Sequence, residues 1–275
     1  MSELVITSPS NPRLRALTAL RRRRTREETG TTLLEGYEEL SLALSAGLRP
    51  ITLYYCPELM LDPTAQLAVV DDVAASGTET IRLGRAAFEK VAYREGPDGF
   101  LAVVRTRQIE CDAVPLGEQP FLLVCQGVEK PGNLGAMLRT ADAAGVDAVL
   151  AIDPVTDWGN PNLVRASKGT VFSVPVASGA TTDSLARMKA RGVTVVAATP
   201  DTDVEYTDVD YTGPVAICVG AEKDGLTDEF LEAADVRVRI PMSGKANSLN
   251  VATSAALIIY EAVRQRRAAR AAPRP

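Results

Sequence analysis

The chain has 275 residues, a formal net charge of −5 and 46% hydrophobic residues. This length can bury a sizeable core and is typical of two domains. No apolar run approaches the roughly 18 residues of a membrane-spanning helix, and the N-terminus lacks a signal-peptide pattern, so we expect a cytoplasmic protein without a membrane segment. Histidine is absent, which excludes Ser-His-Asp and Cys-His nucleophile systems and HExxH metal sites.

The four cysteines form no CxxC pair, and three of them lie in or beside apolar runs. A reduced thiol in such a run packs as a small hydrophobic side chain. The sequence therefore predicts neither a disulfide framework nor a metal centre. The cysteines are Cys56, Cys111, Cys125 and Cys218.

Arginines crowd both ends of the chain, although its average charge is acidic. Clusters of arginine bind phosphate backbones with a salt-sensitive affinity that does not depend on sequence. The alternative is a solvated helix face or a frayed terminus, which is the interpretation that we favour for the C-terminal cluster. Both interpretations stay open for the N-terminal cluster, whose candidate RNA-binding residues are Arg13, Arg15, Arg22 and Arg23.

Residues 1–108 are predicted to form a first domain in which helices and strands alternate. A breaker cluster at 8–12 precedes a helix that carries the arginines and turns Leu14, Leu17 and Leu20 to its apolar side. The alternation indicates a small α/β domain. The later elements are an apolar segment at 32–35, a helix to about 46, a strand at 51–55, a helix at 65–75, a strand at 80–83, a helix through 88 and a strand at 100–104.

Residues 109–120 contain two prolines and a glycine and are predicted to form a linker. Beyond them, apolar runs separated by helix-length segments indicate a parallel sheet with crossover helices. Ligands bind such sheets beyond the carboxyl ends of the strands. Polar clusters follow four of these ends, at 126–133, 199–201, 220–225 and 240–250. The apolar runs lie at 121–125, 148–152, 193–198, 215–219 and 236–240.

Three of the polar clusters carry residues suited to binding a polar ligand. Asn133 and Arg139 stand six apart on one predicted helix, close enough to reach one pocket at its N-terminal side. Residues 220–226 form a glycine-bracketed acidic turn, and 240–251 form a loop of small residues between a strand and a helix. Each stretch alone is also typical of a strand-to-helix turn with a capping residue. Neither GxGxxG nor a Walker sequence is present, so nucleotide triphosphate binding is unsupported.

Taken together, the three stretches resemble the SpoU/TrmH family of RNA ribose 2′-O-methyltransferases, in the knotted SPOUT superfamily. The motifs are NxGxxxRTADAxG at 133–145, GxExxGL at 220–226 and IPMxGxxxSLNVxxxxxxxxYE at 240–261, in the order and spacing of the family. The resemblance covers residues 120–266. The N-terminal domain looks like the smaller α/β, L30e-like RNA-binding domain that many members carry.

The resemblance implies a fold, a cofactor and a partner. Residues 121–266 would form a catalytic domain with a parallel sheet and a trefoil knot, followed by a flexible tail at 267–275. S-adenosylmethionine would be held bent in the knot loops. Members are homodimers with the knot at the interface, so the helix at 249–262 would pack against a partner. On the family pattern the adenosyl group lies among Thr199, Gly220, Ile240, Met242 and Leu249.

The resemblance also implies a reaction, in which a ribose 2′-hydroxyl attacks the methyl group of S-adenosylmethionine. Our hypothesis is that Arg139 clamps the phosphate beside the target ribose and stabilises the developing alkoxide, oriented by Glu222 and Asn133. The candidate catalytic residues on the family pattern are Asn133, Arg139, Glu222, Ser248 and Asn250.

The architecture favours large-subunit (23S) ribosomal RNA as the substrate, because a separate N-terminal domain and a short C-terminal extension resemble ribosomal enzymes, including antibiotic-resistance methyltransferases. Lys168, within 164–169, lines the RNA path in this interpretation and is ordinary surface in the alternative. Three other functions are kept open: a tRNA ribose methyltransferase, a catalytically silent RNA-binding protein, and a base methyltransferase. The silent protein would tolerate Arg139→Ala, and the base methyltransferase would leave its product RNA hydrolysable by alkali.

Overall fold

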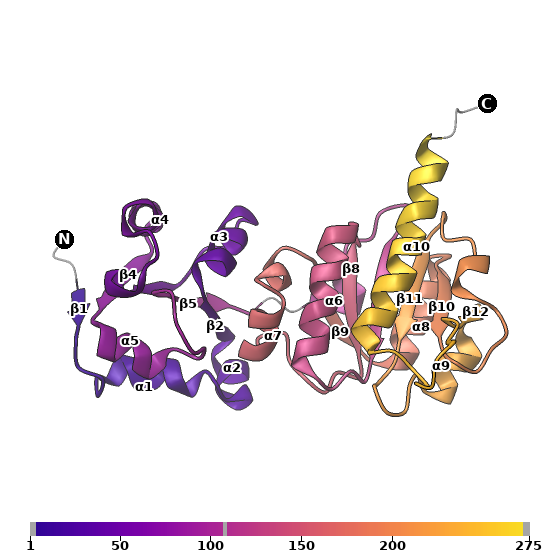
Figure 1. The fold of residues 1–275 in the computed structure, drawn as a ribbon, viewed down its shortest axis with the longest axis horizontal. Coiled ribbons are helices and arrows are strands. Elements are labelled where there is room, and N and C mark those ends of the chain that lie inside the picture. Colours follow the sequence, from indigo (N-terminus) through magenta and orange to yellow (C-terminus); the bar gives the residue numbers. More distant parts are fainter. Residues whose placement is uncertain (1–3, 107–108, 272–275) are drawn as a thin grey trace. The chain divides into compact units, whose positions relative to one another are not determined.

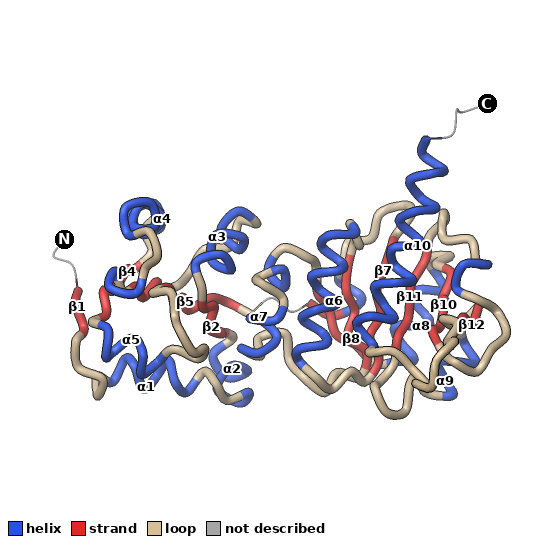
Figure 2. Tube along the Cα trace, in the orientation of Figure 1, coloured by secondary structure: helices blue, strands red, loops and turns tan. Residues whose placement is uncertain are grey.

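The computed structural model describes residues 4–106 and 109–271, drawn in Figure 1 and Figure 2. Contacts divide the chain into two compact units, and the first consists of residues 1–107 together with 157–173. The second unit is the rest of the chain. The predicted C-terminal domain is therefore interrupted, because a segment from its middle packs with the N-terminal unit. No helix in the described ranges is long and apolar enough to cross a membrane.

The first unit contains a five-stranded sheet in the order β1-β4-β3-β5-β2. Strand β5 runs antiparallel to β2 and β3, and the other neighbours are parallel. Leu14, Leu17 and Leu20 all lie in its core, as their spacing predicts. The elements are β1 (Leu4–Ile6), α1 (Pro12–Ala19), α2 (Arg23–Thr29), β2 (Thr31–Glu35), α3 (Tyr37–Ser45), β3 (Thr52–Tyr55), α4 (Pro63–Ala75), β4 (Glu79–Leu83), α5 (Arg85–Val91), β5 (Phe100–Arg105) and, from the inserted segment, α7 (Pro161–Ala166).

The arginine-bearing segment forms two helices, so the prediction of a single helix is wrong. Helix α1 ends at Ala19 and α2 begins at Arg23. The guanidinium of Arg26 turns back and donates hydrogen bonds to the carbonyl oxygens of Leu20 and Arg21, at 3.0 and 2.9 Å. Because a side chain satisfies these two carbonyls, the chain can leave the helix between α1 and α2 without burying unpaired acceptors.

The second unit is built on seven parallel strands in the order β12-β10-β11-β7-β8-β9-β6. Leu122 and Val124 of the central strand β7 pack into a core with α8 and α9, whereas Cys125 contacts Met137 of α6. Helices therefore cover both faces, and Figure 1 shows α10 beside α6. The elements are β6 (Ile109–Glu110), β7 (Phe121–Gln126), α6 (Pro131–Ala144), β8 (Ala148–Ile152), β9 (Val176–Gly179), α8 (Thr181–Ala190), β10 (Thr194–Ala198), β11 (Val215–Val219), α9 (Asp228–Ala233), β12 (Val236–Val238) and α10 (Val251–Ala271).

The five predicted strands of this sheet are present, and two further strands were not predicted. Strand β9 has the sequence VASG, which is too short to show a periodic pattern. Strand β6 lies inside the predicted linker and pairs in parallel with β9. Helix α10 continues to Ala271, so residues 267–271 of the predicted tail are helical. The rest of that tail, 272–275, lies outside the described residues.

The strand order changes direction between β7 and β11. From β7 the chain adds β8 and β9 on one side, and then crosses to β10 on the other side and returns to β11 between β10 and β7. In parallel sheets, ligands bind beyond the carboxyl ends of the strands at such a reversal. The polar clusters that follow β7, β10, β11 and β12 therefore lie along one edge of the sheet.

Candidate functional site

Three loops at the carboxyl edge of the second sheet are joined by hydrogen bonds among Asn133, Glu222 and Asn250. The amide nitrogen of Asn133 donates to Glu222 Oε1 at 2.5 Å, and the amide nitrogen of Asn250 donates to Asn133 Oδ1 at 3.1 Å. The three residues come from the first turn of α6, the β11–α9 loop and the position before α10. The structure thus brings together three of the five candidate catalytic residues, one from each motif.

Glu222 is presented by a short closed loop. The backbone N–H groups of Ala221 and Gly225 each donate to the other residue's carbonyl oxygen, at 3.0 and 2.9 Å. Gly225 has a φ of +72°, and a Cβ at Gly220 would lie 2.0 Å from the carbonyl carbon of Gly225. Both bracketing glycines are therefore required by the backbone geometry, and the loop holds the Glu222 carboxylate in one place.

Asn250 has two roles, because it also caps α10. Its Oδ1 accepts a hydrogen bond from the N–H of Ala252 at 2.9 Å, and its carbonyl oxygen accepts one from Ser254 at 2.9 Å. An asparagine at this position satisfies one of the unpaired N–H groups of the first turn. Its amide nitrogen remains available to donate to Asn133. The same side chain therefore caps the helix and takes part in the candidate site.

A buried amide to which the sequence analysis gave no role, Gln126, ties the β11–α9 loop and the start of α8 to the sheet. Its side chain is 3% exposed at the end of β7. Its Oε1 accepts from the N–H of Thr227, and its Nε2 donates to Thr227 Oγ1, both at 3.0 Å. The same Nε2 lies 2.7 Å from Thr181 Oγ1, which donates to Asp153 Oδ2 at 2.6 Å. Gln126 therefore fixes the end of the β11–α9 loop to the strand that leads into α6.

Arg139 and Ser248 stand apart from these hydrogen bonds. The side chain of Arg139 is exposed on α6, and a separation of six residues places it about 120° around the helix from Asn133. Within residues 4–106 and 109–271, neither Arg139 nor Ser248 has a hydrogen-bond or ion-pair partner for its side chain. The geometry differs from our hypothesis that Glu222 orients Arg139, because Glu222 accepts from Asn133 instead.

The residues that the family pattern assigns to the cofactor lie on the same edge of the sheet. Thr199 and Gly220 directly follow β10 and β11, and Ile240 follows β12 by one residue. Met242 and Leu249 belong to the loop before α10 and are 39% and 37% exposed. Exposed apolar side chains beside strand-end backbone groups suit a ligand with one flat apolar part and several polar groups.

The four candidate RNA-binding arginines of the first unit are all exposed. Arg13 and Arg23 form ion pairs of 2.8 and 2.7 Å with acidic neighbours. Arg15 and Arg22 have no partner in the part of the chain that the structure describes. Exposed ion pairs contribute little free energy, so Arg13 and Arg23 can leave their carboxylate partners and pair with a phosphate instead.

Lys168 already has acidic partners. Its ammonium lies 3.5 Å from a carboxylate oxygen of Glu38 and 3.4 Å from one of Glu39, which is buried. Its backbone adopts a φ of 54°, and the next residue, Gly169, is also left-handed. These contacts hold the inserted segment on α3. They favour the structural interpretation of Lys168 over a place in the RNA path.

The cysteines behave as the sequence predicts, since all four are buried. Burial, with the neighbouring Glu58, raises the pKa of the Cys56 thiol to about 11. Burial also raises the pKa of Cys125 and of Cys218. A thiol that stays protonated at neutral pH is a poor nucleophile. Among the described residues, no group of three or more Cys, Asp or Glu side chains is placed to hold a metal ion.

Comparisons with known proteins agree with this geometry. Residues 120–260 match the SpoU rRNA Methylase family, and residues 11–102 match the MRM3-like substrate binding domain. The 23S rRNA (uridine(2479)-2′-O)-methyltransferase of Streptomyces viridochromogenes is 32% identical over 94% of this chain and 91% of its own length. The tRNA (guanosine(18)-2′-O)-methyltransferase of Escherichia coli (strain K12) is 42% identical over 54% of this chain and 65% of its own length. The AdoMet-bound rRNA methyltransferase of Sinorhizobium meliloti is 30% identical, with a TM-score of 0.86 over 94% of this chain and 97% of that one.

The parallel sheet with its amide and carboxylate cluster, together with the match of residues 120–260 to a methylase family, defines the class of an α/β methyltransferase. The matched family model covers half of the chain, and relatives match along nearly all of it. The chain belongs to the SpoU rRNA methylase family. The resemblance drawn from the three motifs is confirmed, and the N-terminal unit is the substrate-binding domain.

Proposed function

We propose that this chain methylates the 2′-hydroxyl of a ribose in RNA with S-adenosylmethionine as the methyl donor, and that its substrate is 23S ribosomal RNA. The observation that carries the proposal is the hydrogen-bonded set of Asn133, Glu222 and Asn250, which unites the three motifs at one edge of the sheet. The relative that acts on 23S rRNA matches nearly the whole chain, whereas the relative that acts on tRNA matches 54% of it. This difference supports a ribosomal substrate.

The residues present fit S-adenosylmethionine. Exposed Met242 and Leu249 offer apolar contacts to the adenine, and Thr199, Gly220 and Ile240 offer strand-end backbone groups to its polar edge and to the ribose. Within the described ranges, the backbone of 241–249 makes no hydrogen bonds, so its N–H and C=O groups are free to bind a ligand. When bound, S-adenosylmethionine supplies an electrophilic methyl group on a sulfonium.

In the proposed reaction, S-adenosylmethionine would supply the methyl group to the ribose 2′-oxygen, and its sulfur would leave with the electron pair of the broken sulfur–carbon bond. The hydroxyl proton would pass to water. The enzyme has to hold the hydroxyl within attacking distance and stabilise the charge that develops on its oxygen. Arg139 has no partner of its own among the described residues, and it binds the phosphate beside the target ribose as a bidentate clamp. Asn133, held by Glu222 and Asn250, fixes the start of the helix that carries Arg139.

We also propose the knot and the homodimer that the family pattern implies. The strand order β12-β10-β11-β7 and the packing of α10 against α6 and β11 support a C-terminal chain that threads the β11–α9 loop. Leu257 and Tyr260, three residues apart on α10, are 38% and 49% exposed. Large apolar side chains on one exposed helix face support a subunit contact there.

The proposed location is the cytoplasm, where ribosomal RNA is modified, and the first unit would bind the RNA through its exposed arginines. A role in resistance to a ribosome-targeting antibiotic is a further prediction. Growth of a susceptible bacterial host that carries the gene, in the presence of such antibiotics, tests that role.

The experiment that tests the proposed function uses methyl-labelled S-adenosylmethionine with separate pools of ribosomal and transfer RNA. After alkaline digestion, a methylated ribose protects the adjacent phosphodiester, so label should appear in dinucleotides from ribosomal RNA. Label in mononucleotides would identify a base methyltransferase, and label only in transfer RNA would correct the substrate. No label in naked RNA or assembled ribosomal subunits would favour the silent RNA-binding protein.

Arg139→Lys tests the proposed clamp. Lysine keeps the positive charge but loses the planar pair of donors that matches two phosphate oxygens. We expect kcat to fall by about tenfold, with unchanged affinity for S-adenosylmethionine, because Arg139 lies outside the residues assigned to the cofactor. Full activity of Arg139→Lys in the methyl-transfer assay would contradict the clamp.

A further inference from the structure

The last two turns of α10, residues 264–271, extend beyond the core of the second unit. The buried residues of α10 end at Val263. The helix stripe that contains Val263 nevertheless continues, with Arg266, Arg267 and Arg270 at positions i+3, i+4 and i+7. The stripe thus changes from apolar to cationic where the helix leaves the sheet. A helix end without tertiary packing is only marginally stable in water, so this cationic extension needs an explanation.

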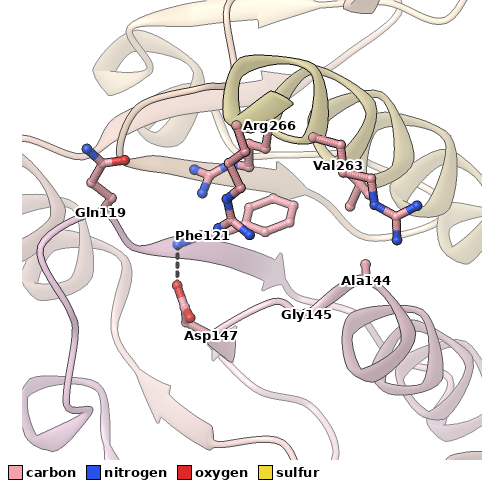
Figure 3. A pocket seen from close by; sticks show the side chains of 9 residues that line it. Gln119, Phe121, Ala144, Gly145, Asp147, Val263 and Arg266 are labelled. Carbon is pink, nitrogen blue, oxygen red and sulfur yellow. Dashed lines mark hydrogen bonds between the residues drawn. The ribbon is translucent and has the colours of Figure 1, made fainter. Parts of the chain in front are cut away.

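These arginines line a cavity of about 260 Å³, shown in Figure 3. The cavity lies where β7 begins, at the amino edge of the sheet, and so at the opposite edge from Asn133 and its partners. It is therefore separate from the site described above. The remaining lining residues are Gln119, Phe121, Ala144, Gly145, Asp147 and Val263.

Arg266 forms the fixed wall of this cavity. Its guanidinium stacks 4.6 Å from the ring centroid of Phe121 and donates to the carbonyl oxygens of Tyr211, at 2.9 Å, and Gly213. Burial lowers the pKa of Arg266, the nearby carboxylate of Asp147 raises it in part, and the charge of Arg270 lowers it. The two positive charges are therefore close enough to repel each other.

The positive charge in the cavity is not balanced by the residues that line it. Three arginines and one aspartate give a net charge of +2, and Asp147 already accepts a hydrogen bond from the N–H of Phe121 at 2.7 Å. Arg267 and Arg270 are exposed and have no partner within 4–106 and 109–271. Arg264, one turn earlier, differs because it pairs with Glu261 at 2.7 Å.

We infer that Arg267 and Arg270 bind phosphate groups of the RNA substrate, at a distance from the methyl-transfer site. This inference rests on the proposed function. Arg267 lies 17 residues after Asn250, which is about 25 Å along a helix, so an RNA that contacts both extends along α10. Two unpaired guanidinium groups, one helical turn apart and beside a rigidly held third, match the bidentate recognition of successive phosphates. The sequence analysis favoured a solvated helix face or a frayed terminus for the C-terminal arginines. In this inference, two of them bind RNA phosphates instead.

The test compares RNA binding by the full-length chain with that of Arg267→Gln/Arg270→Gln over a range of salt concentrations. Ribosomal RNA fragments that the unsubstituted chain methylates serve as the probe. We expect the double substitution to lower the slope of log affinity against log salt by about 2 and to weaken binding roughly tenfold at low salt. Arg264→Gln is the matched control, because it removes one charge from the same helix end. It should leave the slope unchanged.

Three outcomes overturn the inference. Wild-type affinity and slope in the double variant, while the unsubstituted chain methylates RNA, would refute the phosphate contacts and leave the proposed function intact. A lower melting temperature with unchanged RNA affinity would assign the two arginines to the stability of the helix end. Failure of the unsubstituted chain to bind or methylate any RNA would refute both the inference and the proposed function.

Discussion

Asn133→Asp is expected to reduce methyl transfer by about 10²-fold, or about 2.7 kcal/mol of transition-state stabilisation. The substitution keeps the shape of the side chain but replaces the amide that donates to Glu222 with a second carboxylate. Two carboxylates at this separation repel each other when both are ionised, so at neutral pH the start of α6 is pushed away from the β11–α9 loop. The measurement is kcat in the methyl-transfer assay, with S-adenosylmethionine affinity determined separately.

Two further results distinguish a positioning role from a general loss of structure. Asn133→Asp combined with Glu222→Gln restores one donor and one acceptor in exchanged places, and should recover most of the lost rate. The single variant should also gain activity as pH falls, because the carboxylate pair raises one pKa and the retained proton can again be donated. A wild-type rate for Asn133→Asp would show that the hydrogen bond to Glu222 has no part in the reaction.

The motifs predicted the centre of the site because each one encodes a local geometry. The glycines at 220 and 225 close a loop that only glycine allows, and Asn250 is a strong helix cap, so both are visible in sequence. Their meeting with Asn133 follows from the parallel sheet, which aligns all carboxyl ends. Gln126 could not be assigned a role in this way, because its partners lie on elements 55 and 101 residues away.

The fold was predictable where strands are long and apolar. The prediction failed where contacts between distant parts of the chain decide how a segment packs. Nothing local in residues 157–173 indicates that they pack with the first unit rather than with the sheet that surrounds them in sequence. The same holds for Arg26, which lies in sequence within the N-terminal cluster of arginines but is only 3% exposed. Both failures have one cause, since Arg26 and Asp157 bind each other across 131 residues.

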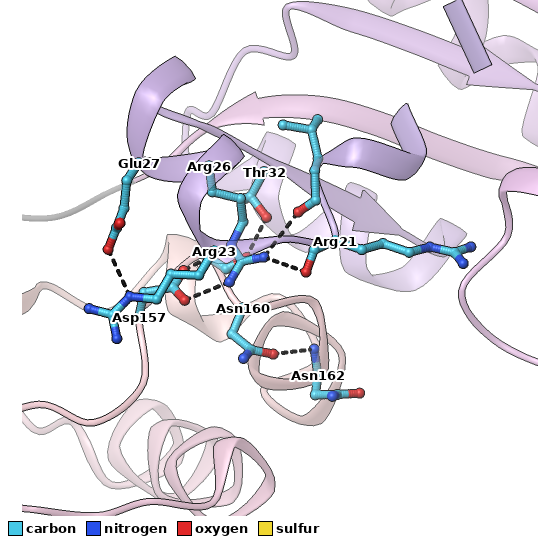
Figure 4. Close-up of polar contacts among 10 residues, drawn as sticks. Arg21, Arg23, Arg26, Glu27, Thr32, Asp157, Asn160 and Asn162 are labelled. Carbon is cyan, nitrogen blue, oxygen red and sulfur yellow. Dashed lines mark hydrogen bonds and ion pairs between the residues drawn. The ribbon is translucent and has the colours of Figure 1, made fainter. Parts of the chain in front are cut away.

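Figure 4 shows how this pair holds the inserted segment. Arg26 Nε and Nη2 donate to the two carboxylate oxygens of Asp157 at 3.0 and 2.6 Å, and the side chain of Asp157 is 13% exposed. Nearby, Thr32 Oγ1 donates to the carbonyl oxygen of Gly159 at 2.5 Å. A buried ion pair adds little stability over a well-packed apolar pair, but removal of one partner leaves the other charge buried without compensation.

Arg26→Met is therefore expected to destabilise the first unit by about 3–5 kcal/mol. The cost includes the Asp157 carboxylate and the two helix-end carbonyls that the guanidinium satisfies. Trp158, the single tryptophan, is 3% exposed beside Asp157, so its fluorescence in urea reports unfolding of this segment directly. We expect the urea midpoint to fall by more than about 1 M.

Arg24→Met is the matched control for this prediction, because Arg24 lies on the same helix in an exposed pair with Glu28 at 2.7 Å. Its loss should change stability by no more than about 0.5 kcal/mol. Asp157→Leu in the Arg26→Met background removes the uncompensated charge and should recover part of the loss. If Arg26→Met and Arg24→Met shift the midpoint equally, the ion pair does not hold the inserted segment, and the packing around Trp158 and Gly159 must do so instead.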